Sequence, residues 1–292
     1  MRIALIFDRT PDDTSGNYFA RALTQLGVSV EHFWLREAAR IPATGFDVYL
    51  RIDHGDYVND LPARLRPSAF YLIDTHLPGP LRKMRRVAPR YDVLFCAQWE
   101  ALRWFPRAVW VPAACDPELH GGAGPQTRRF DVGFVGTEGG LPRKLYLQEI
   151  RERYPRSFIG HAPHTQMSGI YRASRLVFNY AIRNDINMRV FEALGAGRLL
   201  LTNAIRDNGF EELFRDREHL VVYHSPQELW NLLKHYLAHD EEREAIARQG
   251  HELVRSQHTY VHRVRRMLCV LHERLGVASL PAGPVVGQEM RA

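Results

Sequence analysis

The stretch IRNDINMRVFEALGAGRLLLTN, residues 182–203, combines the features that decide the fold. It runs from a polar segment through an amphipathic helix to a glycine stop, and then into the short apolar strand 199–203. Asn184, Asp185 or Asn187 can cap the helix, and the glycines at its end let it close against the strand. A helix that leads directly into a buried strand is typical of a parallel α/β sheet.

The same stretch predicts a site for an anion. Free N–H groups at the start of the helix, together with Arg189, suit a diphosphate. Glu192 follows Arg189 on the same helical face, where its carboxylate can accept hydrogen bonds from two ribose hydroxyls. The alternative is an ordinary amphipathic helix with an Arg–Glu pair on its surface and a glycine stop.

The strand–helix rhythm continues in both directions from this stretch. In the first half we expect strands at 3–7, 28–34, 47–52, 69–73, 92–97 and 108–113, and a helix over 16–26. In the second half we expect strands at 131–136, 157–160, 176–181, 199–203 and 219–223, and helices over 143–154, 187–196 and 241–275. The Gly- and Pro-rich stretch 119–130 separates the two halves. We therefore predict two Rossmann-like α/β domains, 1–120 and 121–275, followed by a disordered tail at 276–292.

Composition narrows the class of protein. The 292 residues are 45% apolar and 25% charged, as in soluble globular proteins with two cores. No apolar run approaches the ~18 residues of a membrane span. The opening MRIALIFDRT lacks the features of a signal peptide, so we expect a cytoplasmic protein. The three cysteines form no CxxC pair and no HExxH spacing occurs, so neither a disulfide framework nor a metal site is indicated.

The net charge of +6 comes largely from arginine and is concentrated in two segments. LRKMRRVAPR, residues 81–90, is one, and the terminal helical segment, with Arg255, Arg263, Arg265, Arg266 and Arg274, is the other. Such faces attract phosphates or anionic lipid headgroups, so peripheral membrane contact through 82–90 is one expectation. An ordinary solvated surface is the alternative. No nucleic-acid motif accompanies the charge, and no nucleic-acid partner is expected.

A second candidate for phosphate binding is the loop GTEGGLPRK, residues 136–144. Its glycines free backbone N–H groups to face a phosphate, and Arg143 or Lys144 adds positive charge. The loop is neither a Walker A sequence nor a GxGxxG fingerprint, so it indicates phosphate binding only in combination with Glu192.

In the first half, acidic and histidine side chains follow two of the expected strands. Asp53 and His54 come after strand 47–52, with Asp56 close by, and Asp74 and His76 come after strand 69–73. Either group can supply the general base that removes a proton from an acceptor hydroxyl, although structural, hydrogen-bonded histidines are equally compatible with the pattern.

The loop after the first strand gives the remaining candidates. Ser15 can cap the helix that follows, and Gly16 allows a ligand to approach closely. We expect these two residues on the acceptor side.

Several of these segments together resemble one family. EALGAGRLLLTN is similar to the "EA-small-x-x-G, then strand" segment of GT-B glycosyltransferases, and it most resembles the spore-maturation CgeB-like proteins with a glycosyltransferase group 1-like C-terminal domain. Residues 109–121, 130–144 and 168–181 resemble further segments of the family in the right order.

The resemblance implies two Rossmann-like domains that face a cleft, with the C-terminal helix returning to the N-terminal domain. It implies donor-site roles for Gly136, Thr137, Arg143, Gly160, His161, Asn187, Arg189 and Glu192. It favours the Asp74–His76 group as the source of the base. One position departs from the family, because retaining group 1 enzymes usually carry a glutamate eight residues before Glu192 and this chain has Asn184.

We therefore expect a metal-independent glycosyltransferase, of the hexosyltransferase type, with a nucleoside diphosphate sugar as donor and a carbohydrate, lipid-linked or protein acceptor. No cofactor is expected. The alternatives are a non-catalytic binding or coat-associated protein with the same fold, and a hydrolysing nucleotide-sugar epimerase.

Overall fold

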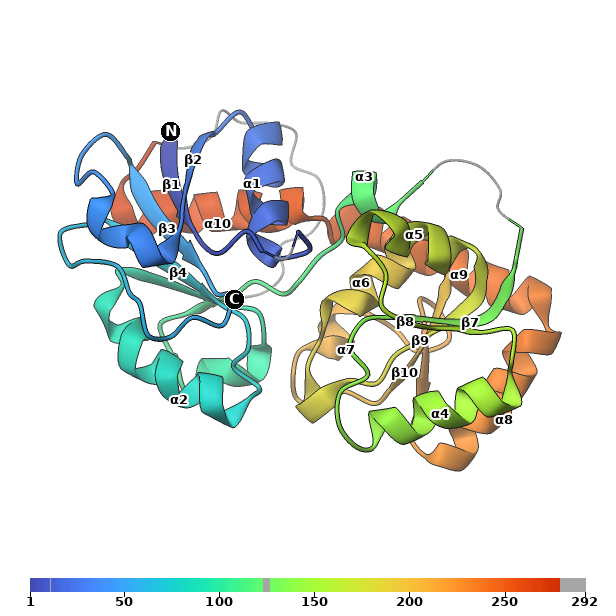
Figure 1. Cartoon of the computed structure of the whole chain (residues 1–292). Helices are drawn as coiled ribbons and strands as arrows, with labels where there is room; N and C mark the ends of the chain where they lie inside the picture. Colours follow the sequence, from blue (N-terminus) through green and yellow to red (C-terminus); the bar gives the residue numbers. More distant parts are fainter. Residues whose placement is uncertain (11, 123–126, 279–292) are drawn as a thin grey trace. The chain divides into compact units, whose positions relative to one another are not determined.

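The computed structural model describes residues 1–10, 12–122 and 127–278. The chain divides into two compact units (Figure 1). Unit 1 comprises Met1–Ala113 and the chain from Tyr260 onward, and unit 2 comprises Ala114–Thr259. The division falls a few residues before the expected boundary at 120. From residue 279 onward, the expected disordered tail lies outside the described residues.

Unit 1 is built on a six-stranded parallel sheet. Its strands are β1 (Arg2–Ile6), β2 (Ser29–Phe33), β3 (Val48–Ile52), β4 (Ser68–Leu72), β5 (Val93–Cys96) and β6 (Val109–Trp110). Its helices are α1 (Ser15–Gln25), α2 (Pro78–Val87) and α10 (Tyr260–Leu275), with short 3-10 helices η1 (Leu35–Arg40), η2 (Ala88–Arg90) and η3 (Trp99–Arg103). Strands β3 and β4 are buried along their whole length, as expected of parallel strands covered on both faces.

Unit 2 is built on a five-stranded parallel sheet. Its strands are β7 (Phe130–Val135), β8 (Phe158–Gly160), β9 (Ser174–Phe178), β10 (Leu199–Asn203) and β11 (Val221–Tyr223). Its helices are α3 (Pro117–His120), α4 (Arg143–Arg153), α5 (His164–Arg172), η4 (Ile182–Asn184), α6 (Met188–Gly195), α7 (Phe210–Leu213), α8 (Pro226–Ala238) and α9 (Asp240–Gln257). The core between sheet and helices includes Phe134, Phe178, Tyr223 and Tyr236.

The two sheets have the same strand order. Unit 1 runs β2-β1-β3-β4-β5-β6 and unit 2, read from its other edge, runs β8-β7-β9-β10-β11. In each unit the second strand therefore lies on one side of the first strand and the later strands lie on the other. Ligands of such sheets bind at the carboxyl ends of the strands where the order reverses, which is β1/β3 in unit 1 and β7/β9 in unit 2.

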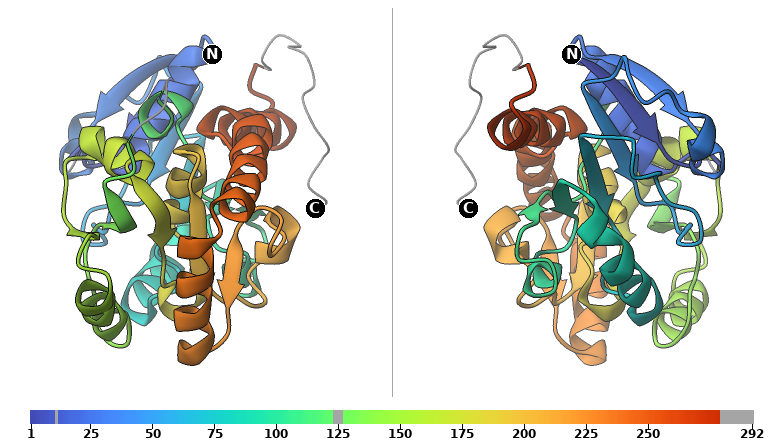
Figure 2. Two further views of the ribbon diagram at one scale, coloured as in Figure 1. Left: turned by 90° about the vertical axis from the view of Figure 1, so that its right-hand side faces the viewer. Right: turned by 90° about the vertical axis from the view of Figure 1, so that its left-hand side faces the viewer.

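The C-terminal helix α10 packs within unit 1. It packs against α1, which it crosses in Figure 1, and the Tyr260 ring stacks on Tyr18 with 5.0 Å between centroids. Phe19 meets the same ring edge-on at 5.3 Å. The helical pattern over 241–275 is thus two helices, α9 and α10, which Figure 2 shows in orange and dark red.

The break between these two helices is caused by contact with a distant part of the chain. His258 leaves the helical conformation, and its carbonyl accepts a hydrogen bond from the backbone N–H of Cys115 at 3.0 Å. Thr259 forms an isolated parallel bridge with Cys115. Pairing with a segment more than a hundred residues away overrides the local helical propensity.

Candidate functional site

The loop that follows β7 is shaped by glycines and by one buried arginine. Gly136 and Gly139 have φ of 129° and 69°, a backbone region that favours glycine. Arg143, at the start of α4, donates from Nε to the Glu138 carbonyl at 2.8 Å and from Nη2 to the Thr137 carbonyl at 2.9 Å. Burial, and then the charge of a second arginine, lowers the pKa of the Arg143 guanidinium. Arg143 therefore stabilises the loop after β7 through hydrogen bonds to its backbone carbonyls.

That second arginine, Arg189 on α6, bridges the ends of β7 and β9. Its Nη2 donates to the Val135 carbonyl at 3.0 Å and its Nη1 donates to Asn179 Oδ1 at 3.0 Å. The guanidinium also lies over the Phe134 ring, 4.1 Å from its centroid. The helix-side arginine thus reaches the point where the strand order of unit 2 reverses, where a ligand is expected.

Gly136 is required by this arrangement. A Cβ on Gly136 would lie 2.7 Å from Nη2 of Arg189, so a larger residue would displace the guanidinium. The Gly136 N–H donates to the Gly160 carbonyl at 2.9 Å, which ties the loop to the end of β8. The exposed His161 follows, and its charge contributes weakly, after hydrogen bonding to Arg151, to the lowered pKa of Glu138.

Among the expected capping residues, Asn187 is the N-cap of α6, but its side chain makes no capping hydrogen bond. It donates instead to Asn179 Oδ1 at 3.3 Å. Asn184 is turned away from the helix, because its side chain pairs with both the backbone N–H and the carbonyl of Arg206. Asn184 has φ of 67° and receives a hydrogen bond on its own carbonyl from Asn208 at 2.7 Å. Asn184, at the position where the family usually carries a glutamate, therefore links the segment before α6 to the loop after β10.

Glu192 is a buried residue of α6, with 8% of its surface exposed. The alternative of an Arg–Glu pair on the surface of an ordinary helix does not describe it. Its charge contributes, after burial, to the raised pKa of the buried Tyr171, whose hydroxyl donates to the Val135 carbonyl at 3.4 Å. Glu192 thus lies close to the same strand end that Arg189 contacts.

The structure therefore brings the expected donor-site residues together around the carboxyl ends of β7, β8 and β9, all within unit 2. Asp185, expected only as a possible cap of α6, is a further buried residue of this region. Its side chain is only 9% exposed, and burial raises its pKa to about 6 against the opposing effects of Asn187, Arg189 and Arg143.

In unit 1, Asp53 follows β3, at the edge of the sheet where the strand order reverses. Its carboxylate accepts hydrogen bonds from the backbone N–H groups of Gly55, Ile73 and Asp74 and from the Tyr57 hydroxyl, at 3.1 to 3.2 Å. Because it accepts hydrogen bonds from four donors, the Asp53 carboxylate holds the ends of β3 and β4 together. Asp53 thus positions the loop that carries Asp74, and a role for Asp53 as the base stays a prediction.

The other candidates for the base in unit 1 are half-buried residues of the loops after β3 and β4. His54 is half-buried with Nδ1 3.1 Å from the Ile52 carbonyl, whereas Asp74 and His76 are half-buried in the loop after β4. One expectation at α1 is corrected. Thr14, rather than Ser15, is the N-cap. A Cβ on Gly16 would lie 2.2 Å from the Phe7 ring, so this glycine accommodates a core side chain.

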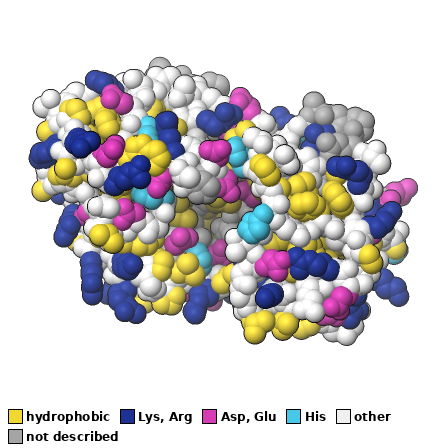
Figure 3. All heavy atoms as spheres, viewed as in Figure 1, with side chains coloured by type: hydrophobic (Ala, Val, Ile, Leu, Met, Phe, Trp, Pro, Cys, Tyr) yellow, Lys and Arg dark blue, Asp and Glu magenta, His cyan; other side chains and the backbone are white. Residues whose placement is uncertain are grey.

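Part of the expected basic surface is present. Figure 3 shows Lys and Arg side chains gathered on unit 1 where α2 lies in Figure 1. Arg82, Lys83, Arg85 and Arg86 of this helix are exposed. Arg263 of the terminal helix corrects the expectation, because it is buried and its Nε donates to the Pro112 carbonyl at 3.0 Å.

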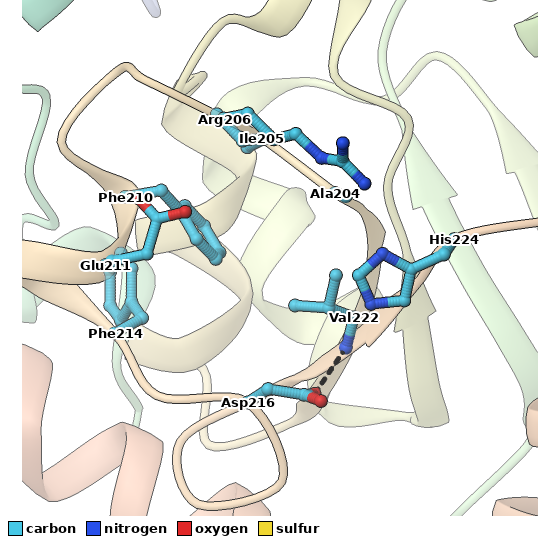
Figure 4. A pocket seen from close by; sticks show the side chains of 9 residues that line it. All are labelled: Ala204, Ile205, Arg206, Phe210, Glu211, Phe214, Asp216, Val222 and His224. Atoms are coloured by element: carbon cyan, nitrogen blue, oxygen red, sulfur yellow. Dashed lines mark hydrogen bonds between the residues drawn. The ribbon is translucent and has the colours of Figure 1, made fainter.

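A pocket of about 190 Å³ lies past the carboxyl ends of β10 and β11 (Figure 4). Its buried apolar residues are Ile205, Phe210, Phe214 and Val222, and Asp216 at its rim accepts a hydrogen bond from the Val222 N–H at 2.7 Å. None of the expected site residues lines this pocket. Its connection to the donor-site region is the Asn184–Arg206 pairing.

In the described part of the chain, no three His, Cys, Asp or Glu side chains are grouped so as to hold a metal ion. Among the same residues, no helix combines the length and apolar character needed to cross a membrane.

Comparison with known proteins decides the family. The family model described as "Glycosyl transferase-like" matches residues 123–269, about half of the chain. The chain belongs to this glycosyltransferase family. The match covers nearly all of unit 2, including the loop after β7 and helix α6. No curated protein matches the chain in sequence.

Solved structures show that this glycosyltransferase has the GT-B fold. It is similar to a sucrose-phosphate synthase from Thermosynechococcus elongatus, with TM-score 0.65, 11% identity and coverage of 94% of this chain and 98% of the other. It is similar to HepE from Anabaena in complex with UDP and glucose, with TM-score 0.63, 14% identity and coverage of 94% and 100%. An alpha-glucosyltransferase in complex with UDP and a 13-mer DNA gives TM-score 0.64, 9% identity and coverage of 93% and 99%.

Proposed function

We propose that this glycosyltransferase transfers a hexose from a nucleoside diphosphate sugar to an acceptor hydroxyl. The observation that carries the proposal is the arrangement of Arg143, Arg189 and the start of α6 at the β7/β9 switch point. Two guanidinium groups and a helix N-terminus supply positive charge where a diphosphate is expected. Several of the similar structures are complexes with UDP, and one is a complex with UDP-glucose, so UDP is the first donor nucleotide to test.

In this reaction the acceptor O–H loses its proton to a base, and its oxygen forms a bond to the anomeric carbon. The bond between that carbon and the diphosphate breaks, and the nucleoside diphosphate leaves. Arg143 and Arg189 would neutralise the charge that develops on the leaving group, which supports a metal-independent mechanism. Activity that persists after removal of divalent ions with EDTA is the expected result.

For the base we propose Asp74. Asp53 accepts a hydrogen bond from the Asp74 backbone N–H at 3.2 Å and so fixes the position of the loop that carries it. A general base at this position would act on the acceptor. His76, in the same loop, is the second residue to test.

For the donor site we propose that Glu192 holds the ribose hydroxyls. Calorimetric titration with UDP, GDP, ADP, CDP and dTDP tests this proposal. Micromolar binding of one nucleotide is expected, with a loss of at least about tenfold in Glu192→Ala, since a hydrogen bond to a charged group contributes about 1.5–3 kcal/mol. Glu241→Ala, an exposed glutamate of α9, is the matched control and should bind as the unaltered protein does. Absence of binding to every nucleotide would overturn the proposed donor site.

The non-catalytic alternative rests on Asn184, whose side chain is engaged with Arg206 and offers no carboxylate to a sugar. Nucleotide binding without sugar transfer to any acceptor, and without donor hydrolysis, would favour it. Donor consumption in the absence of an acceptor would favour the epimerase.

We further propose that unit 1 contacts an anionic membrane surface from the cytoplasmic side through the α2 patch, defined as Arg82, Lys83, Arg85, Arg86 and Trp104. The segment 78–90 contains no acidic residue. Arg85 lies over the Trp104 ring at 4.7 Å from its centroid, and this indole is 43% exposed. Exposed cations beside an exposed tryptophan suit the interface of an anionic bilayer.

A further inference from the structure

The donor-site region contains a buried acid that the proposed reaction does not use. Asp185 lies between η4 and α6, two residues before the N-cap Asn187. Nine-tenths of its surface is buried, and Oδ1 of its carboxyl group has no hydrogen-bond partner within the described chain. A buried polar atom without a partner is rare in folded proteins and asks for an explanation.

A second buried oxygen lies beside it. Oδ1 of Asn187 also lacks a hydrogen-bond partner among the described residues, since the amide of this side chain donates to Asn179 through Nδ2. Two acceptor atoms, on Asp185 and Asn187, are therefore collected at the start of α6. Each of these oxygens needs a neighbouring group that donates a hydrogen bond to it. The Asp185 oxygen can instead carry a proton itself and become a donor.

The neighbouring cations do not provide that donor. Arg143 donates to the carbonyls of Thr137 and Glu138, as described above, and also to the Tyr180 carbonyl at 3.5 Å. Arg189 donates to the Val135 carbonyl and to Asn179 Oδ1. Each guanidinium influences the Asp185 carboxyl group through its charge, and neither makes a direct hydrogen bond to it in the structure.

The charges around Asp185 come from the elements packed against it. Arg189 on α6 and Arg143 on α4 are the charged groups that act on it, and both favour its ionised form. The Asn187 side chain and the Ile182 backbone favour the ionised form as well, but burial outweighs all four and leaves the pKa of this carboxyl group at about 6. Glu192 is a further buried acid of α6 in this region, so protonation of Asp185 adds one positive charge to a group of two arginines and two acids.

We infer that Asp185 takes up a proton when the donor diphosphate binds at the start of α6, and that the neutral carboxyl group then donates a hydrogen bond to a ligand oxygen. The inference rests on the proposed donor site and adds a proton-linked residue to it. A diphosphate beside an ionised, buried carboxylate would be repelled, whereas a protonated carboxyl group offers an O–H donor to the same oxygen. The proton comes from solvent and returns to it when the nucleotide leaves.

The sign of the pH effect follows from linkage. The bound diphosphate raises the pKa of Asp185 above its value in the free protein, so the complex holds more protons than the separate molecules. Affinity is therefore highest below the free-protein pKa of about 6 and falls by up to about tenfold per pH unit above it, until the pKa of the complex is passed.

The probe for the test is UDP-glucose, because its diphosphate is esterified at both ends and lacks the terminal phosphate group that titrates near pH 6 in UDP. Full-length protein is titrated calorimetrically at several pH values between about 5.5 and 8.5, in pairs of buffers with different ionisation enthalpies. The difference between paired buffers gives the number of protons taken up. We expect uptake of close to one proton per site above pH 7 and the decline in affinity described above.

Asp185→Asn is the deciding variant, since it keeps the shape of the side chain and removes its titration. We expect no proton uptake and an affinity that varies by less than about twofold over the same range. The variant should also melt at a higher temperature than the unaltered protein at pH 8, because a buried charge is removed, and this shows that it is folded. His161→Gln is the matched control for the nearby histidine and should retain the proton uptake.

These measurements distinguish failure of the inference about Asp185 from failure of the proposed donor site. UDP-glucose binding without proton uptake, or with equal uptake in Asp185→Asn, overturns the inference and leaves the proposed donor site standing. Absence of UDP-glucose binding at every pH overturns both. Loss of uptake in His161→Gln with uptake retained in Asp185→Asn assigns the proton to the histidine and also overturns the inference.

Discussion

Substitution of Gly136 by alanine tests the geometry of the donor site most directly. Gly136 has φ of 129°, and a Cβ at this position would lie 2.7 Å from Nη2 of Arg189. An alanine in this backbone region costs about 1–3 kcal/mol. Displacing Nη2 from the Val135 carbonyl costs about 1 kcal/mol more. We expect the free energy of unfolding of unit 2 to fall by about 3 kcal/mol in total.

Differential scanning calorimetry measures this change. For a domain the size of unit 2, about 3 kcal/mol corresponds to a drop in Tm of about 6–12 °C. Because the displaced guanidinium also faces the proposed diphosphate, nucleotide affinity should fall about tenfold or more. Gly140→Ala, in the same loop, is the matched control, since nothing lies within 4 Å of a Cβ built there. Its stability should change by less than about 0.5 kcal/mol. Equal behaviour of the two variants would refute the reasoning.

Three further predictions concern unit 1. Asp74→Asn should lower the turnover of sugar transfer by about 100-fold or more while nucleotide affinity stays within about twofold, and unchanged turnover would exclude it as the base. The double variant Arg82→Glu, Arg86→Glu should bind anionic vesicles at least about tenfold more weakly in sedimentation assays, with neutral vesicles as the control, since each cation near such a surface contributes about 1 kcal/mol. Binding at the original level would argue against the α2 patch. Gly16→Ala should lower the free energy of unfolding by about 1–3 kcal/mol, because its Cβ would overlap the Phe7 ring, and an unchanged melting temperature would contradict this packing.

The two sheets and their order along the chain were accessible from the sequence because buried parallel strands produce short apolar runs between helical patterns. The expected strand 108–113 is only Val109–Trp110 in the structure. Pro112 has no N–H to continue the ladder. The break at His258 was not predictable, because it depends on a backbone hydrogen bond from Cys115.

Among the candidate residues, too, some features were predictable from the sequence and others were not. The spacing of Arg189 and Glu192 predicts that both belong to one helix, and both lie on α6, while their roles in donor binding stay predictions. The hydrogen bonds of Asp53 were not predictable, because a sequence does not reveal which donors a carboxylate will meet. Two of these donors, the N–H groups of Ile73 and Asp74, belong to the end of the next strand. The role of Asp185 was missed for the same reason, since its burial is produced by tertiary packing and one of its cationic neighbours, Arg143, is on a different helix.

The return of α10 to unit 1 has a consequence for biosynthesis. Unit 2 is a continuous stretch of chain, whereas unit 1 is interrupted and needs Tyr260 to stack on Tyr18. During translation unit 2 can finish folding as soon as it has left the ribosome, but the part of unit 1 that precedes unit 2 must wait for α10, which follows it. A nascent chain arrested shortly after Thr259 would therefore carry a complete second half and a first half with the surface of α1 uncovered, exposed to chaperones and proteases until the terminal helix arrives.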